Sequence, residues 1–333
     1  MKSFFVKSGI FSAALLLLAL QPIAAPAGAK VLPRLPCSSH GPIPVNALPS
    51  KVSLRGCPIQ GRLLVITLPG DRTGVGIHIP RSGMGIGGVA LTTNGEYVLT
   101  AANADGILHI HWSAPSAHPG RASPDPACRE NAFKYEGPLW ANSGTPTDAW
   151  FYNESTAGRA HLAVSATTSD IKQAATNITH GINNCGFAEG TFGVRSVFKG
   201  NTGKFANLTS SAKCSSKFPD GQNTMSFGPF DSSHPNTLAV TCFAWKTDSN
   251  GTEAMVEADT YIGSNRHMVD KFPSHCTNSF DLQSTMTHEF GHAFGMDHET
   301  SGTHEVMYPF ESPCVLRRHL GGGDWSGMAG LYP

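Results

Sequence analysis

Short β-prone segments alternate with turn residues along the first third of the chain. The turns include the pairs Asn94-Gly95 and Asp105-Gly106, and the segments between such turns cover residues 62–68, 74–79, 97–101 and 107–112. Apolar runs broken by Asn-Gly and Asp-Gly pairs are typical of β-hairpins. The histidines of this stretch alternate with apolar residues, which favours ordinary strand side chains over a metal site: His78, His109 and His111. The pattern predicts a small β-rich region over residues 30–125.

The second half of the chain combines a helical period with a hairpin pattern. Apolar residues from Ile171 to Ile182 recur at spacings of three and four, so a helix is predicted over 169–184 with Ser169 as its N-cap. Residues 238–245 and 254–262 are expected to be strands joined around Asn250-Gly251. A run rich in Pro, Ser and Ala at 113–126 marks a boundary, so a second unit is expected over 126–333.

The N-terminus has the pattern of a secretory signal. Two lysines lie within residues 1–7, an apolar run covers 10–20, and Ala27-Gly28-Ala29 offers small residues for cleavage. A signal peptide over 1–29 is therefore expected, with an uncleaved anchor as the alternative. No later stretch reaches 18 apolar residues, so the mature chain is expected to be secreted, extracellular and without a membrane span.

Charge and cysteine content narrow the classes of function. Lys plus Arg and Asp plus Glu both number 24, and this balance argues against a nucleic-acid partner, which would select a basic surplus. At 333 residues, two folded units are the default expectation. The eight cysteines contain no CxxC pair, which favours disulfides over a cysteine-only zinc site. Their pairing is left open by the sequence.

The most informative run is DLQSTMTHEFGHAFGMDH, which begins at residue 281. On a helix, His288 and His292 are four residues apart and project from one face, so both imidazoles can reach one ion. Glu289 lies one position around the helix, where its carboxylate can hold a metal-bound water. Gly295 allows a sharp bend with positive φ, which returns His298 as a third ligand. Three neutral histidines leave the fourth position of a zinc ion open, as in catalytic sites.

This donor set predicts hydrolysis of peptide bonds. Zinc lowers the pKa of bound water from about 15.7 to about 7, and Glu289 can accept the proton and pass it to the leaving amine. We therefore expect one catalytic Zn²⁺ and protein or peptide substrates. The alternative is a catalytically silent secreted binding protein, which would have no use for Glu289 as a general base. A third hypothesis makes residues 30–125 a carbohydrate-binding or matrix-binding module with the protease as effector.

The run HExxHxxGxxH followed by a methionine resembles the signature of the metzincin zinc endopeptidases. Met307 comes nine positions after His298, and this short interval resembles the matrixins, as do FDLQSTMTHEFGHAFGMDH and the terminal DWSGMAGLYP. The resemblance implies an α+β metzincin-type catalytic domain. Such a domain has a twisted, mostly parallel sheet with an antiparallel edge strand, a zinc helix and a small C-terminal subdomain, preceded here by the β-rich region.

The resemblance also implies roles for other residues. Met307 would form an apolar floor beneath the zinc, Tyr308 and Pro309 would begin the wall of a substrate pocket, and residues 253–263 would supply the edge strand that pairs with an extended peptide. The chain departs from the family pattern at Glu299, where matrixins usually have serine, and at Glu311, where they often have tyrosine. The calcium segment of the animal enzymes is not reproduced at 232–259, so no calcium is predicted.

Two disulfide hypotheses follow. Cys276 and Cys314 bracket the zinc helix and the methionine turn, and a bridge between them is expected. The other concerns latency: Cys57 faintly resembles the cysteine by which matrixin precursors block their zinc, whereas a Cys37–Cys57 bridge together with a bridge from Cys128 into the catalytic unit accounts for the same cysteine counts. The second arrangement is preferred.

Overall fold

The computed structural model describes residues 32–36, 41–59, 61–68, 72–114, 127–141 and 144–333. The expected signal peptide, most of the boundary at 113–126 and Cys37 lie outside these residues. Among the described residues, no helix has both the length and the apolar character needed to cross a membrane.

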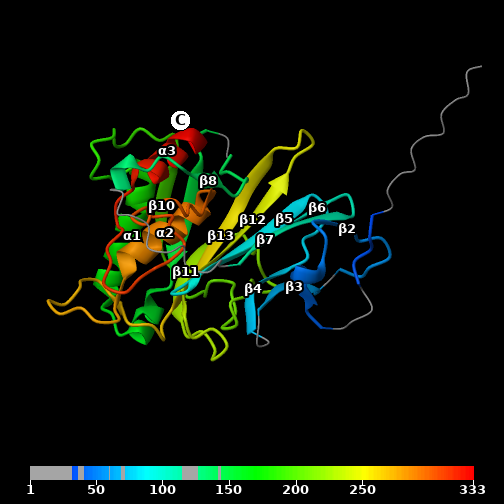
Figure 1. Ribbon diagram of the computed structural model, residues 1–333, viewed down its shortest axis with the longest axis horizontal. Helices are drawn as coiled ribbons and strands as arrows, with labels where there is room; N and C mark the ends of the chain where they lie inside the picture. Colours follow the sequence, from blue (N-terminus) through cyan, green and yellow to red (C-terminus); the bar gives the residue numbers. More distant parts are fainter. Residues whose placement is uncertain (1–31, 37–40, 60, 69–71, 115–126, 142–143) are drawn as a thin grey trace, which may run out of the picture. The chain divides into compact units, whose positions relative to one another are not determined.

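A mixed sheet of nine strands runs through both halves of the described chain (Figure 1). Its spatial order is β10-β9-β11-β13-β12-β5-β6-β7-β2. The first four strands are parallel to one another, and every pairing from β13–β12 to β7–β2 is antiparallel. The strands are β2 (Lys51–Ser53), β5 (Met84–Thr92), β6 (Gly95–Ala104), β7 (Ile107–Ser113), β9 (Thr147–Tyr152), β10 (Arg195–Asn201), β11 (Asn223–Gly228), β12 (Thr237–Thr247) and β13 (Glu253–Gly263).

The remaining elements cover or extend this sheet. A three-stranded sheet contains β1 (Ile43–Pro44), β3 (Leu63–Leu68) and β4 (Arg72–His78). Two short pairs are β14 (Met268–Val269) with β15 (Phe280–Asp281), and β8 (Lys134–Tyr135) with β16 (Met296–Asp297). The helices are α1 (Val164–His180), α2 (Leu282–Ala293) and α3 (Gly322–Leu331), with short 3₁₀ turns η1 (Val45–Ala47), η2 (Ala127–Arg129) and η3 (Glu154–Ala160).

Alternation of side chains along β12 divides the interior into two cores. Phe243 and Trp245 belong to the core that contains α1 and α2, whereas Val240, Cys242 and Ala244 belong to the core beneath the small three-stranded sheet. Successive strand residues point to opposite faces, so one buried strand supplies both cores. Strands β5 and β6 also contribute to both cores, which joins the N-terminal strands to the rest of the fold.

Strand β5 has a weak sequence signal because three glycines interrupt it. A side chain at Gly85 would collide with the ring of Trp245, and one at Gly87 would collide with the ring of Phe243. The glycines therefore leave space for two aromatic rings of β12 to lie across β5. Because glycine lowers strand propensity, the sequence pattern did not predict a strand here. The β3, β4, β6 and β7 strands overlap the four segments expected from the sequence.

The hairpin of β12 and β13 is confirmed, but two other expectations are wrong. Helix α1 begins at Val164, five residues before Ser169. Buried Thr167 holds this first turn, since its hydroxyl donates to the Val164 carbonyl at 2.9 Å and accepts from the Tyr152 hydroxyl at 3.1 Å. Strand β13 is not an edge strand, since it pairs with β11 on one side and β12 on the other. The antiparallel strand of the catalytic half is β12, and its far side pairs with β5.

The cysteine pairings decide between the disulfide hypotheses. Three bridges join described cysteines: Cys128–Cys185, Cys214–Cys242 and Cys276–Cys314. The bridge expected around the zinc helix is therefore confirmed, and Cys128 does cross to the later part of the chain. Cys57 is itself disulfide-bonded. The hypothesis that a Cys57 thiolate blocks the metal site is wrong for this form of the protein, because a bridged sulfur has no thiolate to offer.

Candidate metal centre

Helix α2 presents the predicted ligands from a buried position. Its N-cap is Asp281, whose carboxylate accepts a hydrogen bond from the Ser284 amide at 2.8 Å and pairs with Arg318. The helix ends at Ala293, and Gly295 follows two residues later with φ of +88°. A side chain at Gly295 would also approach the Pro138 carbonyl to 2.7 Å. Only glycine satisfies both conditions, so the bend that returns His298 toward the helix depends on this residue.

The three predicted ligands converge on one point. The Nε2 atoms of His288 and His292 are 3.0 Å apart, and those of His292 and His298 are 2.8 Å apart. The opposite nitrogens of the two helical histidines donate to backbone carbonyls, Nδ1 of His288 to Val306 at 2.7 Å and Nδ1 of His292 to Met296 at 2.9 Å. A proton on Nδ1 leaves the Nε2 lone pair free, which is the tautomer that a metal ligand needs.

A fourth donor comes from a distant part of the chain. Glu96, at the start of β6, places one carboxylate oxygen 3.0 Å from Nε2 of His292 and the other 3.3 Å from Nε2 of His288 and in contact with Nε2 of His298. Its side chain is buried. Burial opposes ionisation, but the three histidines outweigh it and hold the pKa of the Glu96 carboxyl well below its usual range. The sequence analysis missed this residue, because one acid after an Asn-Gly turn carries no spacing signal.

These residues fit a zinc ion. The four donor atoms lie within 4.8 Å of one another and all four residues are buried. Lone pairs that face each other at 2.8–3.0 Å repel unless a cation lies among them, and three imidazoles with a carboxylate are a donor set that zinc accepts. The carboxylate oxygens of Glu96 have no hydrogen-bond donor other than these imidazoles in the described protein.

A second buried carboxylate lies behind the centre. Glu136 approaches Nδ1 of His292 at 3.1 Å, and burial raises the pKa of this carboxyl to about 7. On the other side, Asp297 is 3.6 Å from Nδ1 of His298. Carboxylates in this position orient metal-bound imidazoles. Neither residue was found from the sequence, because the contact depends on the bend at Gly295 and on the β8–β16 pairing that places Glu136 there.

The predicted general base is held by a strand residue. One carboxylate oxygen of Glu289 accepts a hydrogen bond from the Thr241 hydroxyl of β12, which in turn lies 2.9 Å from the Thr260 hydroxyl. The other oxygen, Oε1, has no protein partner among the described residues. Burial raises the pKa of the Glu289 carboxyl to about 7. One oxygen is thus fixed, and the other is left without a protein partner.

The side chain of Met307 contacts helix α2. It is 1% exposed and packs against Gly291, on the turn of α2 between the two helical histidines. Its turn is held from α3, where the Asp324 carboxylate accepts from the amides of Val306 at 2.6 Å and Met307 at 3.0 Å. The methionine turn therefore takes its shape from the closing helix.

Glu305 is buried against Asp324 and contributes a pH effect that can be measured. Burial and the neighbouring carboxylate raise the pKa of Glu305 well above its usual range, so the folded protein keeps a proton there that the unfolded chain releases above about pH 4.5. Stability from this group is complete below that pH and is lost as the pH rises, by at most about 1.4 kcal/mol per pH unit. We expect Glu305→Gln to be more stable than the wild type, by a margin that grows from pH 5 to pH 8.

Thermal unfolding midpoints at both pH values check this expectation. The Glu154→Gln chain serves as control, since it removes a carboxylate from η3. Parallel pH dependence of the wild type and Glu305→Gln would mean that Glu305 ionises normally.

The remaining expected site residues lie beyond the methionine turn. Tyr308 is buried beneath the Arg317 guanidinium at 5.2 Å, and Pro309 is also buried. Glu311, where a tyrosine was anticipated, pairs with Arg317 at 3.2 Å. Glu299 accepts from the amides of Thr300 and Ser301, and it is therefore part of a loop turn, not of the metal centre.

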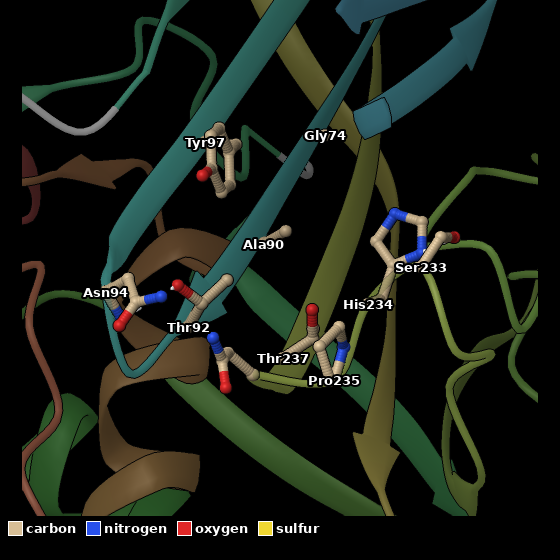
Figure 2. Close-up of a pocket in the computed structure, with 10 residues that line it drawn as sticks. Gly74, Ala90, Thr92, Asn94, Tyr97, Ser233, His234, Pro235 and Thr237 are labelled. Carbon is tan, nitrogen blue, oxygen red and sulfur yellow. Dashed lines mark hydrogen bonds between the residues drawn. The ribbon is translucent and has the colours of Figure 1, made fainter. Parts of the chain in front are cut away.

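One other cluster of polar side chains in the described part of the chain does not form a catalytic set. Ser233, His234 and Asp231 lie together, but Ser233 and Asp231 both contact Nδ1 of His234, at 2.8 and 3.0 Å, so they cannot relay a proton across the ring. Beside them is a pocket of about 70 Å³ lined by residues such as Ala90, Thr92 and Tyr97 (Figure 2). It is too small for a peptide.

Helix α2, the bend at Gly295 and three converging histidines define a metzincin-type metal centre. The chain belongs to the matrixin family, whose model matches residues 148–333, more than half of the sequence. Matrixins are zinc-dependent metalloendopeptidases, so at family level the chain is a peptidase that acts on proteins. No curated protein matches the chain. The matched region includes the three histidines and Glu289 but not Glu96.

Proposed function

We propose that this protein is a secreted zinc endopeptidase, with His288, His292 and His298 as metal ligands and Glu289 as general base. The observation that carries the proposal is the convergence of three Nε2 atoms beside a carboxylate with one free oxygen. We further propose a signal peptide over 1–29, a pro- or accessory region over 30–125 and a catalytic domain over 126–333. The bridged cysteines support an oxidising, extracellular location.

Each group in the centre has a chemical role. A zinc ion held by the three imidazoles would act as a Lewis acid and make water a stronger acid. Glu289 accepts the proton of the attacking water on Oε1 while Thr241 holds the other oxygen, and it then returns the proton to the leaving nitrogen. Gly295 and Met307 fix the positions of the ligands, and Tyr308 and Pro309 form part of the substrate wall.

The competing proposal is a silent binding protein on the same fold. A buried carboxylate with an unpaired oxygen lowers the stability of the folded protein. A binding protein without catalytic activity would carry this cost at Glu289 without any use for the carboxylate. The peptidase proposal accounts for that cost.

Cleavage mapping tests the proposal. Three preparations are loaded with zinc and incubated with an unfolded protein substrate. They are the intact chain, the Glu96→Ala chain, and the intact chain after limited trypsin treatment. Trypsin is inhibited before the substrate is added, and Glu289→Ala preparations receive the same treatment. Mass spectrometry should find new termini in at least one preparation with Glu289, and a chelator should remove them. Absence of chelator-sensitive cleavage in all three would contradict the proposed activity.

A further inference from the structure

Strand pairing and side-chain hydrogen bonds fix the turn that carries Glu96. Strands β5 and β6 pair in register from Met84 with Asn103 to Thr92 with Gly95. Within the turn, the Thr92 hydroxyl donates to the Gly95 carbonyl at 2.5 Å and accepts from the Asn94 amide at 3.1 Å. Glu96 is therefore delivered by a rigid hairpin and not by a loose loop.

The tip of this hairpin is also attached to the catalytic half. The Thr93 amide donates to the Asn236 carbonyl at 3.0 Å, just before β12 begins. Figure 2 shows Thr92 and Asn94 at the turn, next to Pro235 and Thr237 of that segment. This attachment fixes the distance between the turn and the metal centre.

The same hairpin covers the side of β12 that would otherwise be an edge. Strand β5 pairs antiparallel with β12 from Thr92 opposite Thr237 to Met84 opposite Lys246. Thr241, which holds Glu289, lies within this paired stretch, opposite Val89. A substrate peptide that paired with β12 as an added strand would need the backbone N–H and C=O groups along the side of β12 nearest Glu289. In this structure those groups already pair with β5.

We propose that Glu96 is the fourth ligand of the metal centre and that the β5–β6 hairpin keeps the site closed in the full chain, by filling both the remaining coordination position and the free side of β12. The proposal rests on the proposed zinc site. A carboxylate in the fourth position excludes the water that hydrolysis needs, and β5 excludes an extended substrate. Opening the site then requires displacement or cleavage of the hairpin.

A competing explanation is that Glu96 only neutralises protonated histidines in a metal-free protein. The two explanations differ in what happens when metal enters. A ligand stays on the metal and blocks small chelating molecules, whereas a counter-ion loses its partner once the histidines are deprotonated and bound. A measurement on the bound metal can therefore distinguish the two explanations.

Four full-length chains are compared: the wild type, Glu96→Ala, the isosteric but neutral Glu96→Gln, and Asp105→Asn. The last is a matched control, because it removes a carboxylate from the exposed turn at the other end of β6. Each chain is loaded with Co²⁺ in place of zinc, and its visible absorption is recorded while acetohydroxamate is added. The rate at which a chelator withdraws zinc is measured in parallel.

We expect the wild type and Asp105→Asn to share one cobalt spectrum that acetohydroxamate does not change. Glu96→Ala and Glu96→Gln should have an altered spectrum that shifts on acetohydroxamate binding, and both should release zinc at least 10-fold faster. Equal spectra, equal hydroxamate binding and equal zinc release in all four chains would overturn the assignment of Glu96 while leaving the zinc site intact. If no chain took up Co²⁺ or zinc, the proposed function would fail, and this inference with it.

Discussion

Replacing Glu289 with alanine is expected to lower the turnover of a peptide substrate by about 10² to 10⁴-fold while zinc stays bound. The reason is that Glu289 has one oxygen held by Thr241, while its other oxygen has no protein partner among the described residues and can take a proton. The variant leaves the three imidazoles in place, so the metal content should not change.

Turnover and zinc content are measured on the preparation that cleaves substrate. Glu154→Gln is the control. The turnover of Thr241→Val should lie between those of Glu154→Gln and Glu289→Ala, because this substitution removes only the hydroxyl that orients the Glu289 carboxylate. Turnover near that of the control in Glu289→Ala would remove this residue from the mechanism. Loss of zinc in the same variant would assign it a ligand role instead.

Replacing His292 with alanine is expected to abolish both zinc binding and the stability that zinc confers. A ligand present at a thousand times its dissociation constant stabilises a folded protein by about 4 kcal/mol, because it binds the folded state alone. His292 is the central ligand, since its Nε2 lies within 3.0 Å of the other two imidazoles and of Glu96. Removing it breaks three of the contacts that define the centre.

Thermal unfolding with and without zinc measures this effect. The wild type should unfold at a higher temperature with zinc, and His292→Ala should not respond. His304→Ala is the matched control, because His304 is an exposed histidine on the loop between His298 and Met307, and it should respond as the wild type does. A zinc-dependent shift that persisted in His292→Ala would place the metal elsewhere.

The sequence was sufficient where the geometry depends on local spacing. His288, His292, Gly295 and His298 come together because a helix and one glycine bend convert their spacing into geometry. The β12–β13 hairpin and the bridge between Cys276 and Cys314 were predicted correctly for similar reasons, since each depends on a short range of the chain.

The rest depends on contacts between distant segments. Glu96 and Thr241 reach the site from β6 and β12, and no spacing in the sequence connects them with residue 288. Strand β5 was missed because its glycines serve the aromatic rings of β12, and β13 was taken for the edge because the partner of β12 was not recognised. In each case the position of the residue or strand is set by tertiary packing and not by local propensity.

The central claim is that one zinc ion per chain is required for peptide hydrolysis. A zinc titration tests it most directly, on whichever preparation from the cleavage mapping hydrolyses substrate. The protein is freed of metal with a chelator, dialysed, and supplied with zinc in steps while cleavage of a peptide is followed. The account predicts no cleavage without metal, a rise in proportion to added zinc, and a plateau at one zinc ion per chain. Cleavage that survives complete removal of the metal would contradict it.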